Sequence, residues 1–254
     1  MDSFYSNFKD FGFVLKKKLF KNIELQTLEN EFDKIVIQLK NSGEDINARW
    51  GSPLTSHLED NQSTILHTHN VQNYSSKMLK MIENKRLLDR IESLIGPNIL
   101  LHHSKLFYKP PRNGAAFPLH QDWSYFPTEK HTMIAAVIHL TDTTETMGCI
   151  RLIPKSHKLG LIKKSDGHQY TKKIHSKYKL EKATPITTNA GDVLFFHPFT
   201  LHGSMPNISN KPRKTILIQV YSGNDRVKKG NNHINVQLVL RGWNSFATRK
   251  TSNI

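Results

Sequence analysis

The sequence contains a single cysteine, Cys149, among its 254 residues. An intrachain disulfide is therefore impossible, and zinc sites built on two or four cysteines are excluded. Long apolar runs are missing as well. The longest, Met133–Leu140, covers eight residues and includes His139, whereas a bilayer-spanning helix needs roughly twenty. We therefore expect no membrane-spanning segment.

Acidic residues are scarce: 21 Asp and Glu face 36 Lys and Arg, which gives a formal net charge of +15. An excess of this size raises the local concentration of anionic partners. The first ten residues carry Asp2 and Asp10 and do not resemble a secretory signal. The last four residues match no peroxisomal or reticulum address. These observations predict a cytoplasmic protein.

The first part of the chain has helical periodicity. Apolar residues recur every three or four positions from Leu25 to Leu39, which predicts an amphipathic helix. A second helix is predicted over residues 76–95. It ends at Gly96-Pro97, because glycine accepts a left-handed cap and proline cannot continue a helix. Phe11–Leu15 is predicted to be a short strand.

Beyond Gly96 the pattern changes to short β-type runs separated by proline, glycine and asparagine. These runs cover residues 99–109, 132–140, 148–153, 192–196 and 215–221. A series of short strands predicts a sandwich or a barrel. The fold class is therefore α+β, with helices first and an all-β part after them.

Two short motifs in the β part carry metal-ligand chemistry. In His120-Gln121-Asp122 the two ligand types are two residues apart, so on an extended chain both point to the same face. His202 follows a distant apolar strand and could supply a third ligand. Two histidines and one carboxylate on one face of an octahedron form the facial triad of non-haem iron(II) oxygenases.

Such a centre that uses 2-oxoglutarate needs a fixed cation for the distal carboxylate of this co-substrate. Arg213 lies eleven residues after His202, and the residues between them are rich in turn formers. We expect a hairpin that places Arg213 on the strand next to His202, where the guanidinium can bind a carboxylate with two hydrogen bonds. Ser204 shares the face of His202 and could donate a further bond.

These residues and their surroundings resemble the phytanoyl-CoA dioxygenase (PhyH) family of Fe(II)/2-oxoglutarate-dependent oxygenases. The resemblance runs from about Phe11 to about Gly223. It is carried by Gly96-Pro-Asn-Ile99, Lys109-Pro-Pro111, Pro118-Leu-His-Gln-Asp122, Gly148-Cys-Ile-Arg-Leu-Ile-Pro154, Phe195-Phe-His-Pro198, Leu201-His-Gly-Ser204 and Arg213-Lys214.

The resemblance implies a double-stranded β-helix (jelly-roll) core with supporting N-terminal helices in one dioxygenase domain over residues 1–254. Within it we expect a helical part over about 1–96, the jelly-roll core over about 97–225 and a C-terminal extension over about 226–254. A tryptophan that contacts the co-substrate in the phytanoyl-CoA enzyme falls near Val137 here, so the pocket is expected to be lined differently.

The implied iron(II) ligands and catalytic residues are His120, Asp122 and His202. Arg213, Ser204 and Lys105 match positions that contact 2-oxoglutarate, with ascorbate as the expected reductant. Related halogenases lack the carboxylate that Asp122 supplies, so its presence favours hydroxylation. The implied reaction hydroxylates a small or lipid-like, anionic molecule and releases succinate and CO2.

The sequence has 14 histidines, so other histidines are also candidate metal ligands. His197 is a rival ligand, although a packing role near the metal is favoured. His67 and His69 share one face and are interpreted as non-ligands. His102 and His103 are adjacent, so they are expected to point to opposite sides of a strand.

Residues 155–182 form a lysine-rich insertion with nine lysines and two acids. This insertion is either a charged loop at the mouth of the site or a merely solvated segment.

The net charge leaves a second possible function open, namely the same chemistry on nucleic acid or protein. Against nucleic acid, no stretch alternates basic and aromatic residues into a stacking surface. A third possibility is a non-catalytic relative that only binds. The sequence does not set the oligomeric state.

Overall fold

The computed structural model describes residues 3–163, 177–228 and 233–250. Four α-helices lie in the first part of the chain: α1 (Ser3–Phe11), α2 (Asn22–Asn41), α3 (Ser76–Ile82) and α4 (Lys85–Ile95). Five 3-10 turns are η1 (Ser56–Leu58), η2 (Val71–Asn73), η3 (Asp122–Ser124), η4 (Ser156–Leu159) and η5 (Leu180–Lys182). None of the described helices is long and apolar enough to cross a membrane.

The prediction of one continuous helix over 76–95 is wrong, because this stretch forms two helices, α3 and α4. Asn84 lies between α3 and α4, and its side-chain oxygen accepts hydrogen bonds from the N–H groups of Arg86 (3.0 Å) and Leu87 (3.4 Å). This N-cap starts a new helix where the apolar periodicity alone suggests continuation. The end at Gly96 is as predicted, with a φ of +90°.

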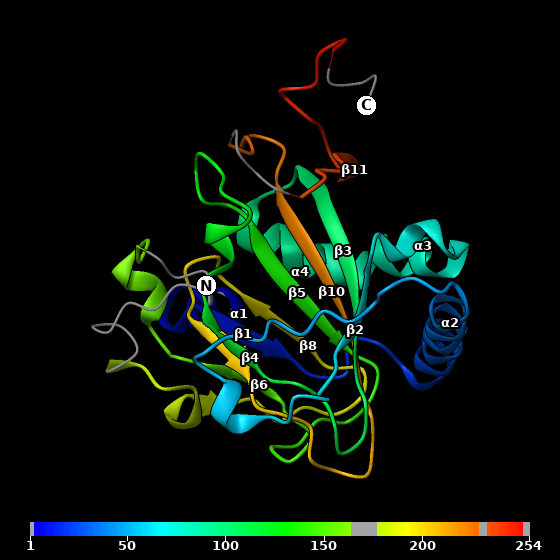
Figure 1. The fold of residues 1–254 in the computed structure, drawn as a ribbon. Helices are drawn as coiled ribbons and strands as arrows, with labels where there is room; N and C mark the ends of the chain where they lie inside the picture. Colours follow the sequence, from blue (N-terminus) through cyan, green and yellow to red (C-terminus); the bar gives the residue numbers. More distant parts are fainter. Residues whose placement is uncertain (1–2, 164–176, 229–232, 251–254) are drawn as a thin grey trace.

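The strands form two antiparallel sheets (Figure 1). The larger has the order β1-β8-β5-β10-β3-β11, with β2 also paired to β3, and the smaller has the order β4-β9-β6-β7. The larger sheet contains β1 (Phe13–Lys16), β2 (Leu66–His69), β3 (Ile99–Lys109), β5 (Ile134–His139), β8 (Val193–Phe196), β10 (Arg213–Ser222) and β11 (Leu238–Arg241). The smaller contains β4 (Phe117–His120), β6 (Ile150–Leu152), β7 (Thr184–Pro185) and β9 (His202–Ser204). Two facing antiparallel sheets confirm the predicted jelly-roll core with helices added.

The helices cover the outer face of the larger sheet. Phe32 of α2, Ile82 of α3 and Ile91 of α4 are buried in one cluster with Leu106 of β3 and Ile216 of β10. Figure 1 shows α4 behind β3, β5 and β10, with α2 and α3 beside the same sheet. The inner face of the larger sheet is therefore left to meet the smaller sheet.

Alternation along β10 separates these two faces. Arg213 and Lys214 are consecutive, so their side chains point to opposite sides of the sheet. Lys214 reaches the helix side, where its Nζ is 2.7 Å from Glu29 and 2.8 Å from Asp33 of α2. Arg213 points the other way, into the space between the sheets.

A β-bulge interrupts the alternation along β3. His103 pairs with Gln219, whereas Leu101 pairs with the next residue, Val220, so His102 is one residue too many. The bulge brings the Nδ1 atoms of His102 and His103 to 2.6 Å from each other. The expectation that these two histidines point to opposite sides is therefore wrong, because it assumes an unbroken strand.

Candidate functional site

A cavity of about 430 Å³ lies between the two sheets. All six residues predicted from the sequence line it: His120, Asp122, His202, Ser204, Arg213 and Lys105. The larger sheet contributes side chains from β2, β3, β5, β8 and β10, and the smaller sheet contributes side chains from β4, β6 and β9. The fold thus assembles one site from residues that lie far apart in the sequence.

His120, Asp122 and His202 converge at one point of this cavity. Asp122 Oδ1 lies 3.5 Å from His120 Nε2 and 3.5 Å from His202 Nε2. One ligand atom from each residue lies within 4.8 Å of the other two, and all three residues are buried. β4 and β9 pair His120 directly with His202, and one residue separates the end of β4 from Asp122, which begins η3. The predicted facial triad is therefore present as a geometry.

Backbone carbonyls orient both imidazoles as metal ligands. His120 Nδ1 lies 2.9 Å from the Pro118 carbonyl oxygen, and His202 Nδ1 lies 3.0 Å from that of Thr200. A carbonyl can only accept, so each Nδ1 carries the hydrogen, and Nε2 is the ring atom of a neutral imidazole that can bind a metal at the meeting point. The pKa of His202 is lowered to about 4, mainly by burial and next by His120. His202 is therefore neutral at neutral pH, as a metal ligand must be.

The carboxylate of Asp122 is held by Gln219 of β10. Gln219 Nε2 donates a hydrogen bond of 2.5 Å to Asp122 Oδ2. Burial raises the pKa of Asp122, but His202, His120 and this hydrogen bond lower it, and the resulting pKa is about 2. The group is thus a charged oxygen ligand across the physiological pH range. Two imidazoles and one carboxylate are the donor set that suits iron(II) with open positions.

Arg213 and Ser204 form the distal end of the cavity. The expectation that Arg213 lies on the strand next to His202 is wrong, because β9 belongs to the smaller sheet and β10 to the larger. The connection between them crosses from one sheet to the other, and Arg213 faces His202 across the cavity. The Arg213 side chain donates to the Gly148 carbonyl. Its Nε is buried and has no hydrogen-bond partner among the described residues, which fits a carboxylate acceptor.

The opposite half of the cavity is lined by imidazoles around Lys105. His67 and His69 of β2 pair with Phe107 and Lys105 of β3, and His233 lies 5.4 Å from His69 between ring centroids. Burial, followed by the charge of Lys105, lowers the pKa to about 4 for His67 and His233 and to about 3 for His69. These rings are neutral hydrogen-bonding groups. As expected, neither His67 nor His69 belongs to the triad, although both line its cavity.

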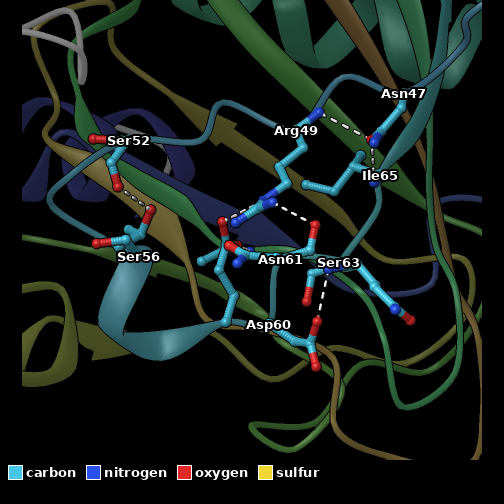
Figure 2. A network of polar contacts seen from close by, with 12 residues as sticks. Asn47, Arg49, Ser52, Ser56, Asp60, Asn61, Ser63 and Ile65 are labelled. Atoms are coloured by element: carbon cyan, nitrogen blue, oxygen red, sulfur yellow. Dashed lines mark hydrogen bonds and ion pairs between the residues drawn. The ribbon is translucent and has the colours of Figure 1, made fainter.

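A polar network fixes the segment that contains Arg49 and Trp50 (Figure 2), and both of these residues line the cavity. Arg49 donates from Nε to Glu59 (2.8 Å) and from a terminal nitrogen to the Asn61 carbonyl (2.7 Å). The Asn47 side chain accepts hydrogen bonds from the N–H groups of Arg49 and Ile65, each of 3.1 Å. The network holds Trp50 in place, with its ring centroid 4.7 Å from that of His120.

The lysine-rich insertion begins beside the metal motif. Gln121, between the two ligands of β4 and η3, donates to the Gly160 carbonyl (2.9 Å) and accepts from the Ile162 N–H (2.9 Å). Residues 160–162 are thereby held near the triad. The central part of the insertion, 164–176, lies outside the described residues, so the prediction of a charged loop at the mouth of the site stays a prediction.

Sequence reasoning missed several residues of the site. Gln219 and Trp50 stand in no recognisable motif, and His233 follows the core strands. β2 was not predicted, because its four residues, Leu66–His69, have no long alternating pattern. Val137, the position where the related enzyme has a tryptophan, does line the cavity.

Comparisons with known proteins agree with this geometry. The family described as phytanoyl-CoA dioxygenase (PhyH) matches residues 8–215. Human peroxisomal phytanoyl-CoA dioxygenase is 29% identical over 221 residues, which cover 82% of this chain and 64% of the human one. The chain thus spans slightly less than two thirds of that relative.

Two further matches show how widely similar proteins differ in substrate. A probable alpha-ketoglutarate-dependent hypophosphite dioxygenase of Stutzerimonas stutzeri is 30% identical over 152 residues, 57% of this chain and 53% of that protein. The solved structure of the epimerase SnoN, in complex with Fe3+, alpha ketoglutarate and nogalamycin RO, has a TM-score of 0.73 at 17% identity. That match covers 94% of this chain and 97% of SnoN, and it supports the fold alone.

Proposed function

Because the chain belongs to the phytanoyl-CoA dioxygenase (PhyH) family of Fe(II)/2-oxoglutarate-dependent oxygenases, we propose that it hydroxylates a small anionic substrate and releases succinate and CO2. The observation that carries the proposal is the convergence of His120, Asp122 and His202, in which Asp122 Oδ1 lies 3.5 Å from the Nε2 of each histidine, in a cavity that Arg213 also lines.

Different residues of the cavity would bind the metal and the co-substrate. His120, Asp122 and His202 would hold iron(II) on one face, with Gln219 fixing the carboxylate. Arg213 and Ser204 would bind the distal carboxylate of 2-oxoglutarate, because the unpartnered Nε of Arg213 needs an acceptor at this depth. When bound, iron(II) and 2-oxoglutarate supply the oxidising power that inserts one oxygen atom of O2 into a C–H bond of the substrate.

Lys105 lies at the border between the metal ligands and the imidazole-lined half. Its Nζ is 5.1 Å from the centre of the Phe126 ring, and the charges of Lys105 and Asp122 influence each other. The Lys105 ammonium at this border can attract an anion on either side. We propose that it contacts the 2-oxo acid end of the co-substrate on one side and the anionic substrate on the other.

The charge balance of the cavity supports an anionic substrate. Asp122 is the sole carboxylate among the described residues that line it, whereas Arg213 and Lys105 are cations and Arg49 is paired with Glu59. With a divalent iron bound, the doubly charged 2-oxoglutarate leaves one positive charge uncompensated. An anionic substrate would remove the cost of this buried charge, and the neutral imidazole of His69, whose buried Nε2 has no partner among the described residues, offers its oxygens a hydrogen bond.

The size of the cavity supports a small substrate. About 430 Å³ is near the lower end of the range for small-molecule sites, roughly 300–1,000 Å³, and 2-oxoglutarate occupies part of it. Trp50, Tyr125 and Phe126 contribute aromatic walls to the cavity. A compact carboxylate, phosphonate or phosphorus oxyanion fits these walls better than a nucleic acid strand does.

The test is a substrate screen with the iron(II)-loaded protein, 2-oxoglutarate, O2 and ascorbate, in which succinate release is measured. Small anions should stimulate succinate release, and neutral analogues of the same shape should not. The Asp122→Ala variant serves as the blank for uncoupled chemistry. Stimulation by neutral or cationic compounds alone would refute the anionic substrate, and an absence of succinate under every condition would favour a non-catalytic binding protein.

A further inference from the structure

Lys109 is a fully buried lysine behind the distal end of the cavity. Its side chain is 0% exposed, and its Nζ donates to Ser204 Oγ and to the Met205 carbonyl, both at 2.7 Å. Both acceptors are uncharged. The nearby carboxylate of Glu59 already accepts hydrogen bonds from Arg49 and from the Ala116 N–H. The ammonium therefore has no carboxylate of its own to compensate its charge.

The register of the larger sheet places this lysine beside Arg213. Lys109 of β3 pairs directly with Arg213 of β10, and directly paired residues share one face of a sheet. Burial, and next the charge of Arg213, keeps the pKa of Lys109 well below its usual range. Two neighbouring cations buried in this way are costly unless an anion joins them.

Ser204 connects Lys109 to the cavity. Ser204 lines the cavity, and its hydroxyl oxygen accepts the hydrogen bond from Lys109 Nζ. A hydroxyl that accepts from an ammonium presents its own hydrogen elsewhere. Ser204 and Arg213 line the same cavity, and Arg213 Nε has no hydrogen-bond partner among the described residues, so we infer that the hydroxyl hydrogen is available to a ligand there. The ammonium thus makes Ser204 a donor toward the ligand.

We propose that Lys109 is a positioning residue for the distal carboxylate of 2-oxoglutarate, which acts through Ser204 and adds a second positive charge to that of Arg213. The inference rests on the proposed function, since it assigns a further residue to the same co-substrate site. The expected consequence is selectivity. Lys109 favours 2-oxo acids that carry a second carboxylate over those that end in a methyl group.

The test compares two co-substrates that differ only at their distal end. The iron(II)-loaded protein is titrated without O2 with 2-oxoglutarate and with 2-oxopentanoate, and binding is followed by the visible charge-transfer absorption of the metal complex. Lys109→Met should weaken 2-oxoglutarate binding by about tenfold or more, as expected for a lost hydrogen-bonding interaction with a charged group. Binding of 2-oxopentanoate should change by less than about twofold.

Two further variants separate positioning from general damage. Lys214→Met makes the same substitution in the residue after Arg213, on the opposite face of β10, and should leave the preference between the two acids unchanged. Ser204→Ala should lose part of the preference, and the double variant with Lys109→Met should lose no more than the stronger single variant, because both residues act on one contact.

The outcomes are distinct. Equal weakening of both acids, additive effects of the two substitutions, or an unchanged preference in Lys109→Met would overturn the role of Lys109. If Lys109→Met cannot be purified, Ser204→Ala alone decides, and an unchanged preference overturns the inference. If the unaltered protein binds no 2-oxoglutarate at all, the proposed function itself fails.

Discussion

Gln219 Nε2 lies 2.5 Å from Asp122 Oδ2 and holds the carboxylate so that its other oxygen, Oδ1, faces both histidines of the triad. The two residues are 97 positions apart in the sequence. β10 brings them together, and the same strand begins with Arg213. One strand therefore holds the triad carboxylate and carries the arginine that we propose for the co-substrate.

Removal of this contact should weaken metal binding. Gln219→Met keeps the length of the side chain but loses the N–H donor, so Asp122 can rotate away from the ligand position. We expect the affinity for iron(II) to fall by about tenfold to a hundredfold, the range for lost partners of metal ligands. Metal titration of the apoprotein measures it. An unchanged affinity would show that Asp122 is held without Gln219.

Alanine at any triad position should abolish 2-oxoglutarate turnover while the protein stays folded. His197→Gln is the matched control, because His197 is a half-buried histidine five residues before His202 that packs against Phe199, with ring centroids 5.4 Å apart. It should retain turnover. Succinate release together with thermal unfolding measures both properties, and normal turnover in a triad variant would refute that ligand.

Lys105 should make anion binding depend on pH. Burial lowers its pKa from 10.5 to about 8, and Asp122 offsets a part of the effect. Below pH 8 the ammonium is charged and anion affinity should be constant; above pH 8 the charge is lost and affinity should fall by up to about tenfold per pH unit. KM of the anionic substrate against pH measures this.

Variants of Lys105 give the control for that profile. Lys105→Arg keeps its charge beyond pH 8, so the fall in affinity should disappear. Lys105→Met should bind the anionic substrate weakly at every pH. The stability of the fold should change with pH in the opposite direction to the anion affinity. Between about pH 8 and 10.5 the folded protein binds fewer protons at Lys105 than the unfolded chain does. The contribution of Lys105 to the free energy of unfolding therefore rises over this pH range. A fall in affinity that persists in Lys105→Arg would assign it to another group.

Gly148 should be intolerant of a side chain. Its φ is +66°, and an added Cβ would lie 2.2 Å from the Met205 carbonyl oxygen, the acceptor of Lys109. Gly43 has a φ of +76° with no atom within 4 Å of an added Cβ. Gly43→Ala should therefore cost only the left-handed backbone term, about 1–2 kcal/mol, and Gly148→Ala clearly more. Chemical unfolding of both variants tests this, and equal losses would contradict the close contact.

Local patterns were sufficient for the ligands of the site. The spacing of His120 and Asp122 on an extended chain, and the place of His202 after an apolar strand, predicted a triad that the structure brings together. Arg213 lines the predicted cavity, but the hairpin from which this placement was predicted is absent. The prediction of a hairpin came from the turn-forming residues after His202. The connection instead passes from one sheet to the other, a choice that depends on the packing of both sheets.

The supporting residues could not be predicted, because each depends on long-range register. Gln219 reaches Asp122 since β10 pairs with β3 and β5, and nothing in its own surroundings marks it. His102 and His103 point together because of a bulge that is visible only in the pairing. Asn84 divides a helix through its cap, which a periodicity argument does not weigh.

The alternation along β3 limits how such a site can acquire a new specificity. Lys105, Phe107 and Lys109 serve the interior, whereas Leu106 and Tyr108 pack toward the helices. Insertion or deletion of one residue within this stretch would exchange the two sets and destroy pocket and core at once. Descendants of this chain, natural or engineered, should therefore diverge by exchange of side chains at fixed positions along β3, and length changes should accumulate near His102, where the sheet already accommodates a surplus residue.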